Sequence, residues 1–379
     1  MRICVVSPSF PTPKTIDFVF VDQLCRAFAD LGHEVVVIAP QSVTKCLFRH
    51  IPLMPQHSWY QTAQGNSIEL YRPYSVSLSD SKLSKFFKNS HKHAVKRAFR
   101  RIKQKPDVCY GHFWGSIFSV YPMAKQNGIP LFGASGEESV AYYVHQAPET
   151  INELRNYVSG VVSVSTKNRD ECLDLHLIDE EKSVVIPNAI DQSLFHKLDK
   201  TECRRELNIT DNDFVVAFVG QFVPRKGTLR LNEALKKLGN RQIKAVFIGS
   251  GNEDPDYDGI IYKGRVAHDD VPKWLNAADV FVLPTENEGC CNAIIEAMAC
   301  GLPIISTDAS FNYDILNKGN SIMVDCHDIG AIANAIKTMK NNPKRREEMS
   351  LNALKTAEGL KIDKRAEKII EFINKSKQQ

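Results

Sequence analysis

The segment VFVLPTENEGCCNAIIEAMACGLPII, residues 280–305, decides the fold, because it contains a predicted strand, a turn and a helix in that order. Its first four residues are an apolar run that stops at Pro284, as expected for a short buried strand. Asn292 then opens an amphipathic stretch that ends at Gly301, a residue typical of a helix stop. The same alternation of apolar runs and helical stretches recurs along the chain.

Two carboxylates frame this turn. Glu288 lies on the loop at the mouth of the helix, and Glu296 lies about one turn inside it. Backbone N–H groups at a helix start point outward and hold phosphate well; here they belong to Gly289, Cys290, Cys291, Asn292 and Ala293. One acid near a pyrophosphate and a second one turn away can bind sugar hydroxyls on either side of it.

The arrangement closely resembles the E-x7-E signature of the retaining family-four glycosyltransferases, the glycosyltransferases group 1, which have the two-domain GT-B fold. The family pattern reads roughly S-x-x-E-G-x-x-N-x-x-x-E-A-M-A-x-G-x-P, and residues 285–303 fit it with Thr at the first position. The resemblance implies that Glu288 contacts the transferred sugar and that Glu296 contacts the nucleotide ribose.

Length and composition fit this class of protein. The chain has 379 residues, enough for two domains, and its net charge of +4 with 24% charged residues argues against a dedicated nucleic-acid binder. The first ten residues, MRICVVSPSF, contain no long apolar core of a signal peptide or membrane span. The ten Cys form no C-x-x-C pair, as expected for reduced thiols in a cytoplasmic protein.

Apolar runs alternate with helical segments in both halves of the chain, which predicts an α/β protein with two doubly wound parallel sheets in Rossmann-like domains. In a GT-B fold the two domains face each other across a cleft. We expect an acceptor-side domain over residues 1–185 and a nucleotide-sugar domain over residues 186–359, with a last helix, about 360–379, that crosses back to the first domain as in the family. The predicted strands are 3–6, 35–39, 108–110, 131–133, 161–164, 184–186, 214–219, 245–248, 260–262, 280–283, 304–306 and 322–324.

The joint between the halves contains IPNAIDQSLF, residues 186–195. This string resembles the family element I-P-N-G-V-D-x-x-x-F, with Ala189 in place of the usual Gly.

A basic turn follows the first strand of the second half, in GQFVPRKG, residues 220–227. Arg and Lys at the carboxyl end of a strand can neutralise a pyrophosphate leaving group. The turn resembles the family element G-R-x-x-x-x-K-G, in which Lys226 matches the Lys. Gln221 stands at the Arg position, and Arg225 is the candidate substitute. The alternative is an ordinary solvated basic turn.

Two further turns of the second half resemble donor-binding elements of the family. Gly249 and Gly251 form a G-x-G turn, and the backbone near Val266 lies where the family reads the nucleobase edge. The D-x-D spacing of Asp254 and Asp256 is used by metal-dependent transferases, but its Pro, Asn and Gly neighbours favour a solvated turn. We therefore predict no metal and no cofactor besides the nucleotide sugar, which is the donor substrate.

On the acceptor side, the strand around residue 131 ends in Ser135-Gly136-Glu137, where many family members have T-x-H-G. The family His is absent, and Glu137 is the candidate to orient an acceptor or sugar hydroxyl. His112, at the end of the strand around residue 108, is the nearest alternative imidazole. A single His at a strand end is more often structural than catalytic.

The segment KLSKFFKNSHKHAVKRAFRRIKQK, Lys82 to Lys105, has ten Lys or Arg and no acid, with apolar residues at helical spacing. This pattern suits a helix on an anionic membrane surface. It equally suits a solvated helix that packs on its own sheet. RNA binding is a third reading, but no RNA-reading motif accompanies the charge.

Together these features predict a retaining glycosyltransferase, cytoplasmic and peripheral at the membrane if the basic helix binds lipid. Its expected donor is a UDP- or GDP-linked sugar and its expected acceptor a glycan or a lipid-linked glycan, in surface polysaccharide biosynthesis. The alternatives are a GT-B-type nucleotide-sugar epimerase and a non-catalytic nucleotide-sugar-binding protein. A dehydrogenase is disfavoured, since no G-x-G-x-x-G follows the first strand.

Overall fold

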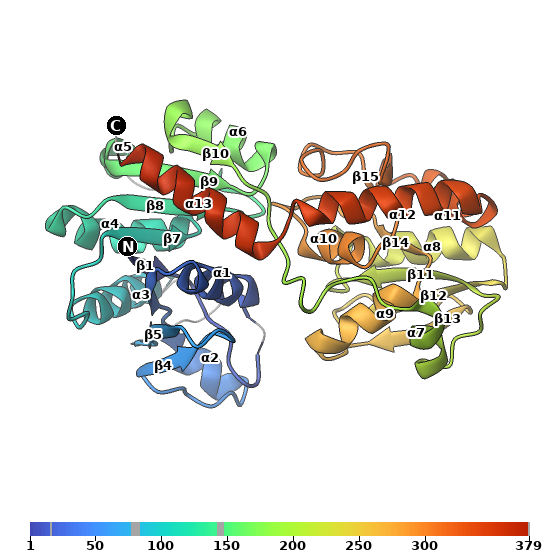
Figure 1. Ribbon diagram of the computed structural model, residues 1–379, viewed down its shortest axis with the longest axis horizontal. Coiled ribbons are helices and arrows are strands. Elements are labelled where there is room, and N and C mark those ends of the chain that lie inside the picture. Colours follow the sequence, from blue (N-terminus) through green and yellow to red (C-terminus); the bar gives the residue numbers. More distant parts are fainter. Residues whose placement is uncertain (16, 77–83, 142–147, 378–379) are drawn as a thin grey trace. The chain divides into compact units, whose positions relative to one another are not determined.

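The computed structural model describes residues 1–15, 17–76, 84–141 and 148–377, with the backbone alone for residues 84–89. Internal contacts divide the chain into two compact units (Figure 1). Unit 1 comprises Met1–Ile186 and the segment that begins at Ile362, and unit 2 comprises Pro187–Lys361. Each unit is built around its own sheet.

The sheet of unit 1 has eight strands in the order β10-β9-β8-β7-β1-β2-β5-β4. Neighbouring strands are parallel, except that β4 pairs antiparallel with β5 at one edge. The strands are β1 (Arg2–Val6), β2 (Glu34–Ile38), β4 (His57–Gln61), β5 (Ser67–Tyr71), β7 (Val108–His112), β8 (Leu131–Ser135), β9 (Val158–Ser163) and β10 (Ser183–Val185); β3 (Gln41–Ser42) and β6 (Tyr74–Ser75) pair separately.

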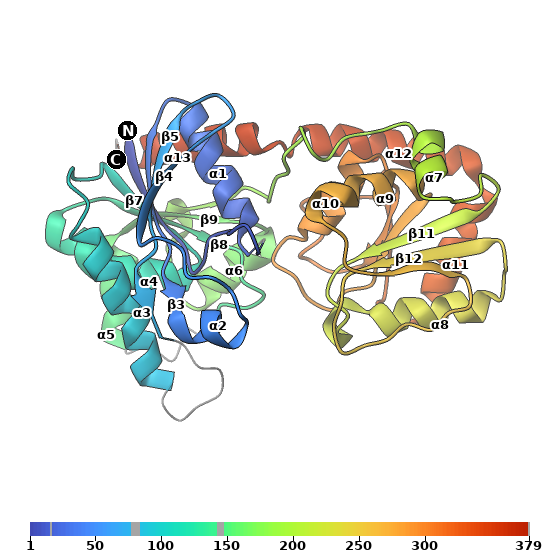
Figure 2. The ribbon, with the colours of Figure 1, turned by 90° about the horizontal axis from the view of Figure 1, so that it is seen from below.

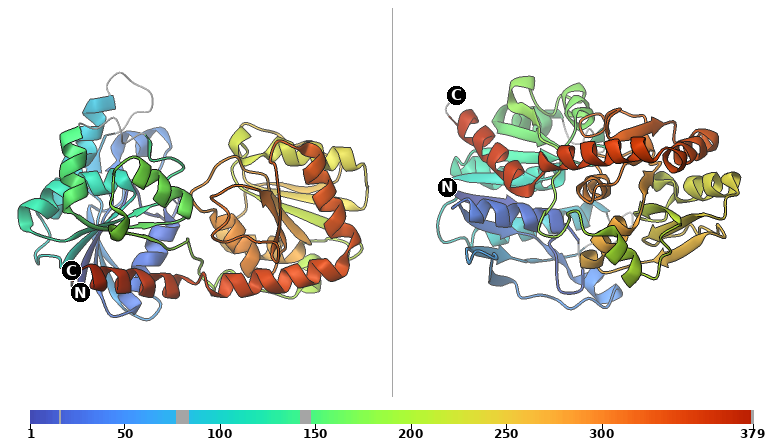
Figure 3. Two further views of the ribbon diagram at one scale, coloured as in Figure 1. Left: turned by 90° about the horizontal axis from the view of Figure 1, so that it is seen from above. Right: turned by 45° about the vertical axis from the view of Figure 1, so that its right-hand side comes forward.

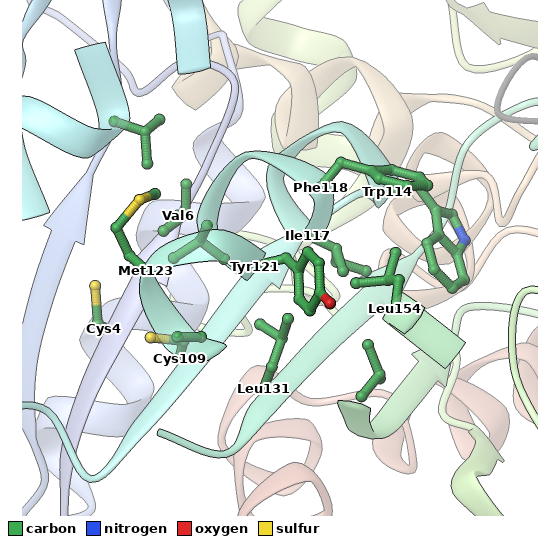
Figure 4. Close-up of a cluster of buried hydrophobic side chains, with 14 of the residues drawn as sticks. Cys4, Val6, Cys109, Trp114, Ile117, Phe118, Tyr121, Met123, Leu131 and Leu154 are labelled. Atoms are coloured by element: carbon green, nitrogen blue, oxygen red, sulfur yellow. The ribbon is translucent and has the colours of Figure 1, made fainter. Parts of the chain in front are cut away.

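Helices cover both faces of this sheet because its strands are apolar on both sides. Ile3 and Val5 face a core shared with α1 (Val19–Asp30) and α13 (Ile362–Ser376), which lie side by side in Figure 3. Cys4 and Val6 face the opposite core, where α4 (Trp114–Asn127) packs on β7 and β8 (Figure 4). The other helices of unit 1 are α2 (Val43–Phe48), α3 (Ser84–Phe99), α5 (Pro148–Tyr157), α6 (Thr166–Asp174) and the short η2 (Glu180–Lys182).

The sheet of unit 2 has six parallel strands in the order β13-β12-β11-β14-β15-β16. They are β11 (Phe214–Val219), β12 (Ile243–Ile248), β13 (Ile260–Gly264), β14 (Val280–Leu283), β15 (Ile304–Thr307) and β16 (Ser321–Val324). Figure 2 shows β11 and β12 side by side. The helices are α7 (Lys200–Glu206), η3 (Pro224–Lys226), α8 (Thr228–Leu238), η4 (His268–Asp270), α9 (Val271–Ala277), α10 (Asn292–Ala299), α11 (Ile329–Asn341) and α12 (Pro343–Glu358). The chain order reverses between β11 and β14, so this pair is the switch point at which open α/β sheets bind ligands.

The structure confirms the strands predicted in both halves and the α/β class of each unit. The prediction of two parallel, doubly wound sheets is confirmed, but the edge strand β4, which is antiparallel, and its partner β5 were not among the predicted strands. The sequence of β4, HSWYQ, has only two apolar residues, and both are at least partly exposed. An edge strand with little apolar burial gives no strong strand pattern.

Candidate donor site

The predicted site forms where the chain leaves β11 and β14, the two neighbouring strands at the switch point of unit 2. The turn η3 follows β11 and carries Arg225 and Lys226, while the loop after β14 carries Glu288. Gly227, which ends η3, has φ +76°, and a Cβ there would stand 2.3 Å from the carbonyl oxygen of Pro284. Glycine therefore lets the two loops approach each other closely.

Three donors converge on one oxygen of Glu288. Its Oε1 lies 3.0 Å from Arg225 Nη1 and 2.5 Å from Lys226 Nζ, and it accepts a third bond of 2.8 Å from the buried hydroxyl of Thr285. The Glu288 side chain is 11% exposed. A carboxylate so deep in the protein is stable only when it is paired and hydrogen-bonded, and here both conditions hold.

Backbone contacts fix this arrangement. Arg225 also donates from Nη1 to the carbonyl of Asn287 at 2.8 Å, and its own carbonyl accepts the N–H of Glu286 at 2.8 Å. Burial alone disfavours the Lys226 ammonium, but the pKa of Lys226 is raised overall, and at neutral pH the charge and the hydrogen bond of Glu288 favour the ammonium. Lys226 is therefore a cation at neutral pH.

Glu296 differs from Glu288 in its surroundings. It lies one turn inside α10, and burial raises the pKa of its carboxyl to about 7. Among the residues that the structure describes, none donates a hydrogen bond or forms an ion pair with this carboxyl. It is therefore available to accept hydrogen bonds from a bound molecule, at the cost of burying a charge when it ionises.

The turn between the two glutamates belongs to the same buried surface. Gly289, Cys290 and Cys291 are buried, and Cys291 is the N-cap of α10. Burial raises the pKa of the Cys291 thiol to about 11, so it is neutral near pH 7. The turn is held by Asn188, whose Nδ2 donates to the Cys290 carbonyl at 3.0 Å and to Asn292 Oδ1 at 2.8 Å.

The remaining predicted donor residues line the ends of neighbouring strands. Gly249 has φ +150°, and a Cβ there would stand 1.8 Å from the Gly220 carbonyl oxygen. A Cβ at Gly251 would stand 2.1 Å from the Phe222 carbonyl oxygen. Gln221 is exposed, and Val266 is half-buried in the loop after β13. Gln221 stands at the Arg position of the family element, and Arg225 is its candidate substitute. Arg225 bonds to Glu288 beside Lys226, whereas Gln221 is exposed.

In unit 1, Glu137 closes the start of α4. Its Oε1 accepts the Trp114 N–H at 2.6 Å and its Oε2 accepts the Gly136 N–H at 3.0 Å. Burial raises the pKa of this carboxyl to about 7 against the effect of those N–H groups. A carboxylate at a helix start is a capping group, so Glu137 has a structural role apart from any acceptor contact.

His112 is buried at the end of β7, between Phe20 and Phe113, with ring centroids 5.3 and 4.7 Å away. Burial, assisted by the charge of Arg365, lowers the pKa of His112 to about 3. Its Nδ1 has no hydrogen-bond partner within the described residues. The imidazole is therefore neutral, and β7 is next to β1 at the switch point of the sheet of unit 1.

The D-x-D spacing belongs to a surface turn. Asp254 pairs with Lys263, and Asp256 bonds to Asn232 at 2.8 Å and pairs with Lys236 at 2.6 Å. The Asp254 and Asp256 side chains are 83% and 67% exposed. Over the described ranges, no group of three or more His, Cys, Asp or Glu side chains is arranged to hold a metal ion.

The basic segment is helical from Ser84 to Phe99, and its first residues, 82 and 83, lie outside the described part of the chain. The described apolar side chains, Ala94, Val95, Ala98 and Phe99, are buried in the core of unit 1. Insertion of this apolar face into a membrane, one reading of the sequence, is therefore wrong for residues 94–99. No helix in the described part of the chain is both long and apolar enough to cross a membrane.

Three contributors to the site were not among the predicted residues. Thr285 donates a hydrogen bond to Glu288. Asn188 donates one to the Cys290 carbonyl in the turn before α10. Arg230 donates to the Pro284 carbonyl at 2.8 Å and pairs with Glu286 at 2.7 Å. Thr285 stands at the first position of the quoted signature and Asn188 within the linker element, so both motifs already contained the signal.

Comparison with known proteins bears on the family of the chain. The model of the family described as Glycosyl transferases group 1 matches residues 199–356, and that of Glycosyltransferase Family 4 matches residues 18–194. Bacillus subtilis (strain 168) TuaC, provisionally named as a teichuronic acid biosynthesis glycosyltransferase, is 28% identical over 357 residues, covering 89% of this chain and 88% of TuaC. The Escherichia coli UDP-Gal:alpha-D-GlcNAc-diphosphoundecaprenol alpha-1,3-galactosyltransferase is 29% identical over 226 residues, covering 55% and 58%.

Solved structures show the fold. Sucrose-phosphate synthase from Thermosynechococcus elongatus has a TM-score of 0.80 at 17% identity, covering 99% of this chain and 98% of that chain. Anabaena Alr3699/HepE in complex with UDP-glucose has a TM-score of 0.74 at 17% identity, covering 99% and 100%. The chain has the GT-B fold and belongs to the family-four, group 1 glycosyltransferases.

Proposed function

We propose that this glycosyltransferase is a retaining, metal-independent enzyme that moves a sugar from a UDP- or GDP-linked donor to a glycan or lipid-linked acceptor in surface polysaccharide biosynthesis. The observation that carries the proposal is the meeting of Arg225 and Lys226 on Glu288 beside the start of α10, with Glu296 one turn further. Two cations and outward N–H groups suit a diphosphate, and two carboxylates suit sugar hydroxyls.

The chemistry follows from these placements. The bond between the sugar C1 and the diphosphate oxygen breaks while a bond forms from the acceptor oxygen to C1 on the same face. The departing phosphate oxygen takes the acceptor proton, so no protein base is required. Arg225 and Lys226 stabilise the charge that develops on the leaving diphosphate, and the N–H groups before α10 add to that stabilisation.

Glu288 has a different role from a nucleophile. Its Oε1 is held by two cations and a hydroxyl, which lowers its reactivity toward a sugar carbon. We assign it to the transferred sugar, where it orients a hydroxyl and offsets charge that builds up on the ring. Glu296 is assigned to the ribose hydroxyls.

The names of relatives support the substrate classes. The E. coli relative is named for a UDP-linked galactose and a diphosphoundecaprenol-linked acceptor, and the HepE structure contains UDP-glucose. A membrane-borne acceptor agrees with a cytoplasmic enzyme held at the inner face of the cell membrane through exposed cations, which include Lys96 and Arg97 of α3 and Arg100 and Arg101 just after it. Each such residue near an anionic surface contributes about 1 kcal/mol.

A thermal-shift screen over nucleotide sugars tests the donor assignment. A ligand present at about 100 times its dissociation constant adds roughly 2.7 kcal/mol to stability. The best stabiliser is then supplied with a labelled sugar and candidate acceptors. Transfer of label supports the proposal. Conversion of the donor sugar without transfer would favour the epimerase alternative, and binding with neither transfer nor slow donor hydrolysis would favour the binding protein.

A further inference from the structure

Helix α2 and the loop that follows it expose apolar side chains to an unusual degree. Phe48 is 72% exposed and Leu47 71%, the highest values among the large apolar side chains that the structure describes, and nearby Leu53 is 43% exposed. None of the residues of α2 is buried. Single exposed apolar residues are ordinary, but two adjacent ones with a third close by indicate a surface that is covered in use.

The sequence around these residues carries positive charge and no negative charge over a long stretch. No Asp or Glu occurs from residue 35 to residue 68, whereas Lys45, Arg49 and His50 flank the exposed pair. Asp17 lies 3.8 Å from Lys45, but both side chains are nearly half exposed, so this pair is weak. Apolar side chains interleaved with cations match the interface of an anionic bilayer, which offers hydrocarbon below and phosphate at the surface.

The neighbouring basic helix supplies more charge. A cavity of about 230 Å³ is lined by Lys45 and Cys46 of α2, by Arg72 and by His91 of α3, so the two helices border the same space. Figure 2 shows α2 and the start of α3 at the same end of unit 1. Helix α3 buries its described apolar side chains and exposes cations, while α2 exposes its apolar ones.

We propose that α2 is the inserting element of a membrane contact to which the cations of α3 also contribute: Leu47 and Phe48 enter the headgroup region of an anionic bilayer while Arg49 and Lys45 contact lipid phosphates. The contact extends the proposed function, on which it rests only for the acceptor being lipid-borne. The cavity beside α2 is lined by the almost buried Arg72, by His91 and by the carboxylate of Asp17, so the lipid contact is assigned to the exposed side of α2 and not to the cavity.

Vesicle co-sedimentation of the full chain tests this inference. Vesicles of phosphatidylglycerol are compared with vesicles of phosphatidylcholine, at low and at high salt. The wild type is expected to bind the anionic vesicles and to keep part of that binding at high salt, since insertion of apolar side chains is not screened. The double variant Leu47→Ser, Phe48→Ser is expected to bind about tenfold more weakly and to lose the salt-resistant part.

The matched control is Leu351→Ser on α12, a leucine that is 59% exposed in unit 2 and is expected to leave vesicle binding unchanged. A second readout is the fluorescence of Phe48→Trp, which should shift to the blue with anionic vesicles. The inference is overturned if the wild type binds no vesicles, if the double variant binds as the wild type does, or if Phe48→Trp shows no shift. Donor hydrolysis by the double variant should be unchanged, which separates this inference from the catalytic proposal.

Discussion

Lys226 Nζ lies 2.5 Å from Glu288 Oε1, although the two residues are 62 positions apart in the chain. The bond joins the loops after β11 and β14, and Arg225 reinforces it from the same turn. Two cations thus share one carboxylate, which leaves the cluster with net positive charge. In the proposed mechanism this positive charge is already in place when the donor diphosphate binds, so little reorganisation is needed.

Replacing Lys226 by Ala should lower the specificity constant for donor very roughly 30- to 150-fold, because the lost charge-assisted contact to the leaving phosphate is worth about 2–3 kcal/mol. Steady-state kinetics with the donor identified in the screen measures the effect. Lys273→Ala is the control, since its pair with Glu206 is at the surface. Near-normal turnover of a folded Lys226→Ala enzyme would remove this residue from the mechanism.

The two glutamates should separate binding from transfer. Glu296→Gln removes the charge that receives the ribose hydroxyls, so a nucleoside diphosphate should bind about tenfold more weakly or worse, since a charged hydrogen bond contributes about 1.5–3 kcal/mol. Glu288→Gln leaves both cations in place, so the nucleoside diphosphate should bind as well as before while transfer collapses. Calorimetric titration of both variants makes the comparison, and equal losses of nucleotide affinity would contradict the assignment.

The stability of the protein should carry a pH signature from Glu296. Its folded pKa is about 7, above the ordinary value of 4.5, so between these pH values the folded state keeps a proton that the unfolded state has lost. Stability therefore falls as pH rises from 4.5 to 7 and is level above that range. Urea unfolding at pH 5, 6 and 7 measures the free energy of unfolding, and Glu296→Gln should make its decrease with rising pH smaller. Part of the decrease should remain, because the pKa of Glu137 is also raised to about 7. Parallel pH profiles of the two proteins would refute it.

Activity should be largely insensitive to a metal chelator, because Arg225 and Lys226 supply the positive charge at the site. Asp254→Asn and Asp256→Asn should each be mild, since these carboxylates pair with surface lysines. Transfer assays with and without chelator check this expectation. Complete loss that manganese or magnesium restores would instead make the D-x-D turn a metal site.

The sequence alone was sufficient for most of the fold and for the segments that carry the candidate site. Apolar runs marked the strands, and in a parallel sheet the carboxyl ends lie at one edge, which is where η3 and the loop before α10 are found. What could not be predicted were partners chosen by tertiary structure. The bond of Lys226 to Glu288, the capping of α4 by Glu137 and the burial of Phe99 each depend on segments far apart in the chain.

The most direct test of the account is the anomeric configuration of the first product. The enzyme is supplied with the donor that stabilises it most and with an accepted acceptor, and proton NMR follows the anomeric signal of the transferred sugar from the earliest time points. We expect the new linkage to have the same anomeric configuration as the donor, with loss of this signal in Lys226→Ala. A product of inverted configuration would contradict same-face transfer, and release of nucleoside diphosphate without any new linkage would contradict the proposed reaction.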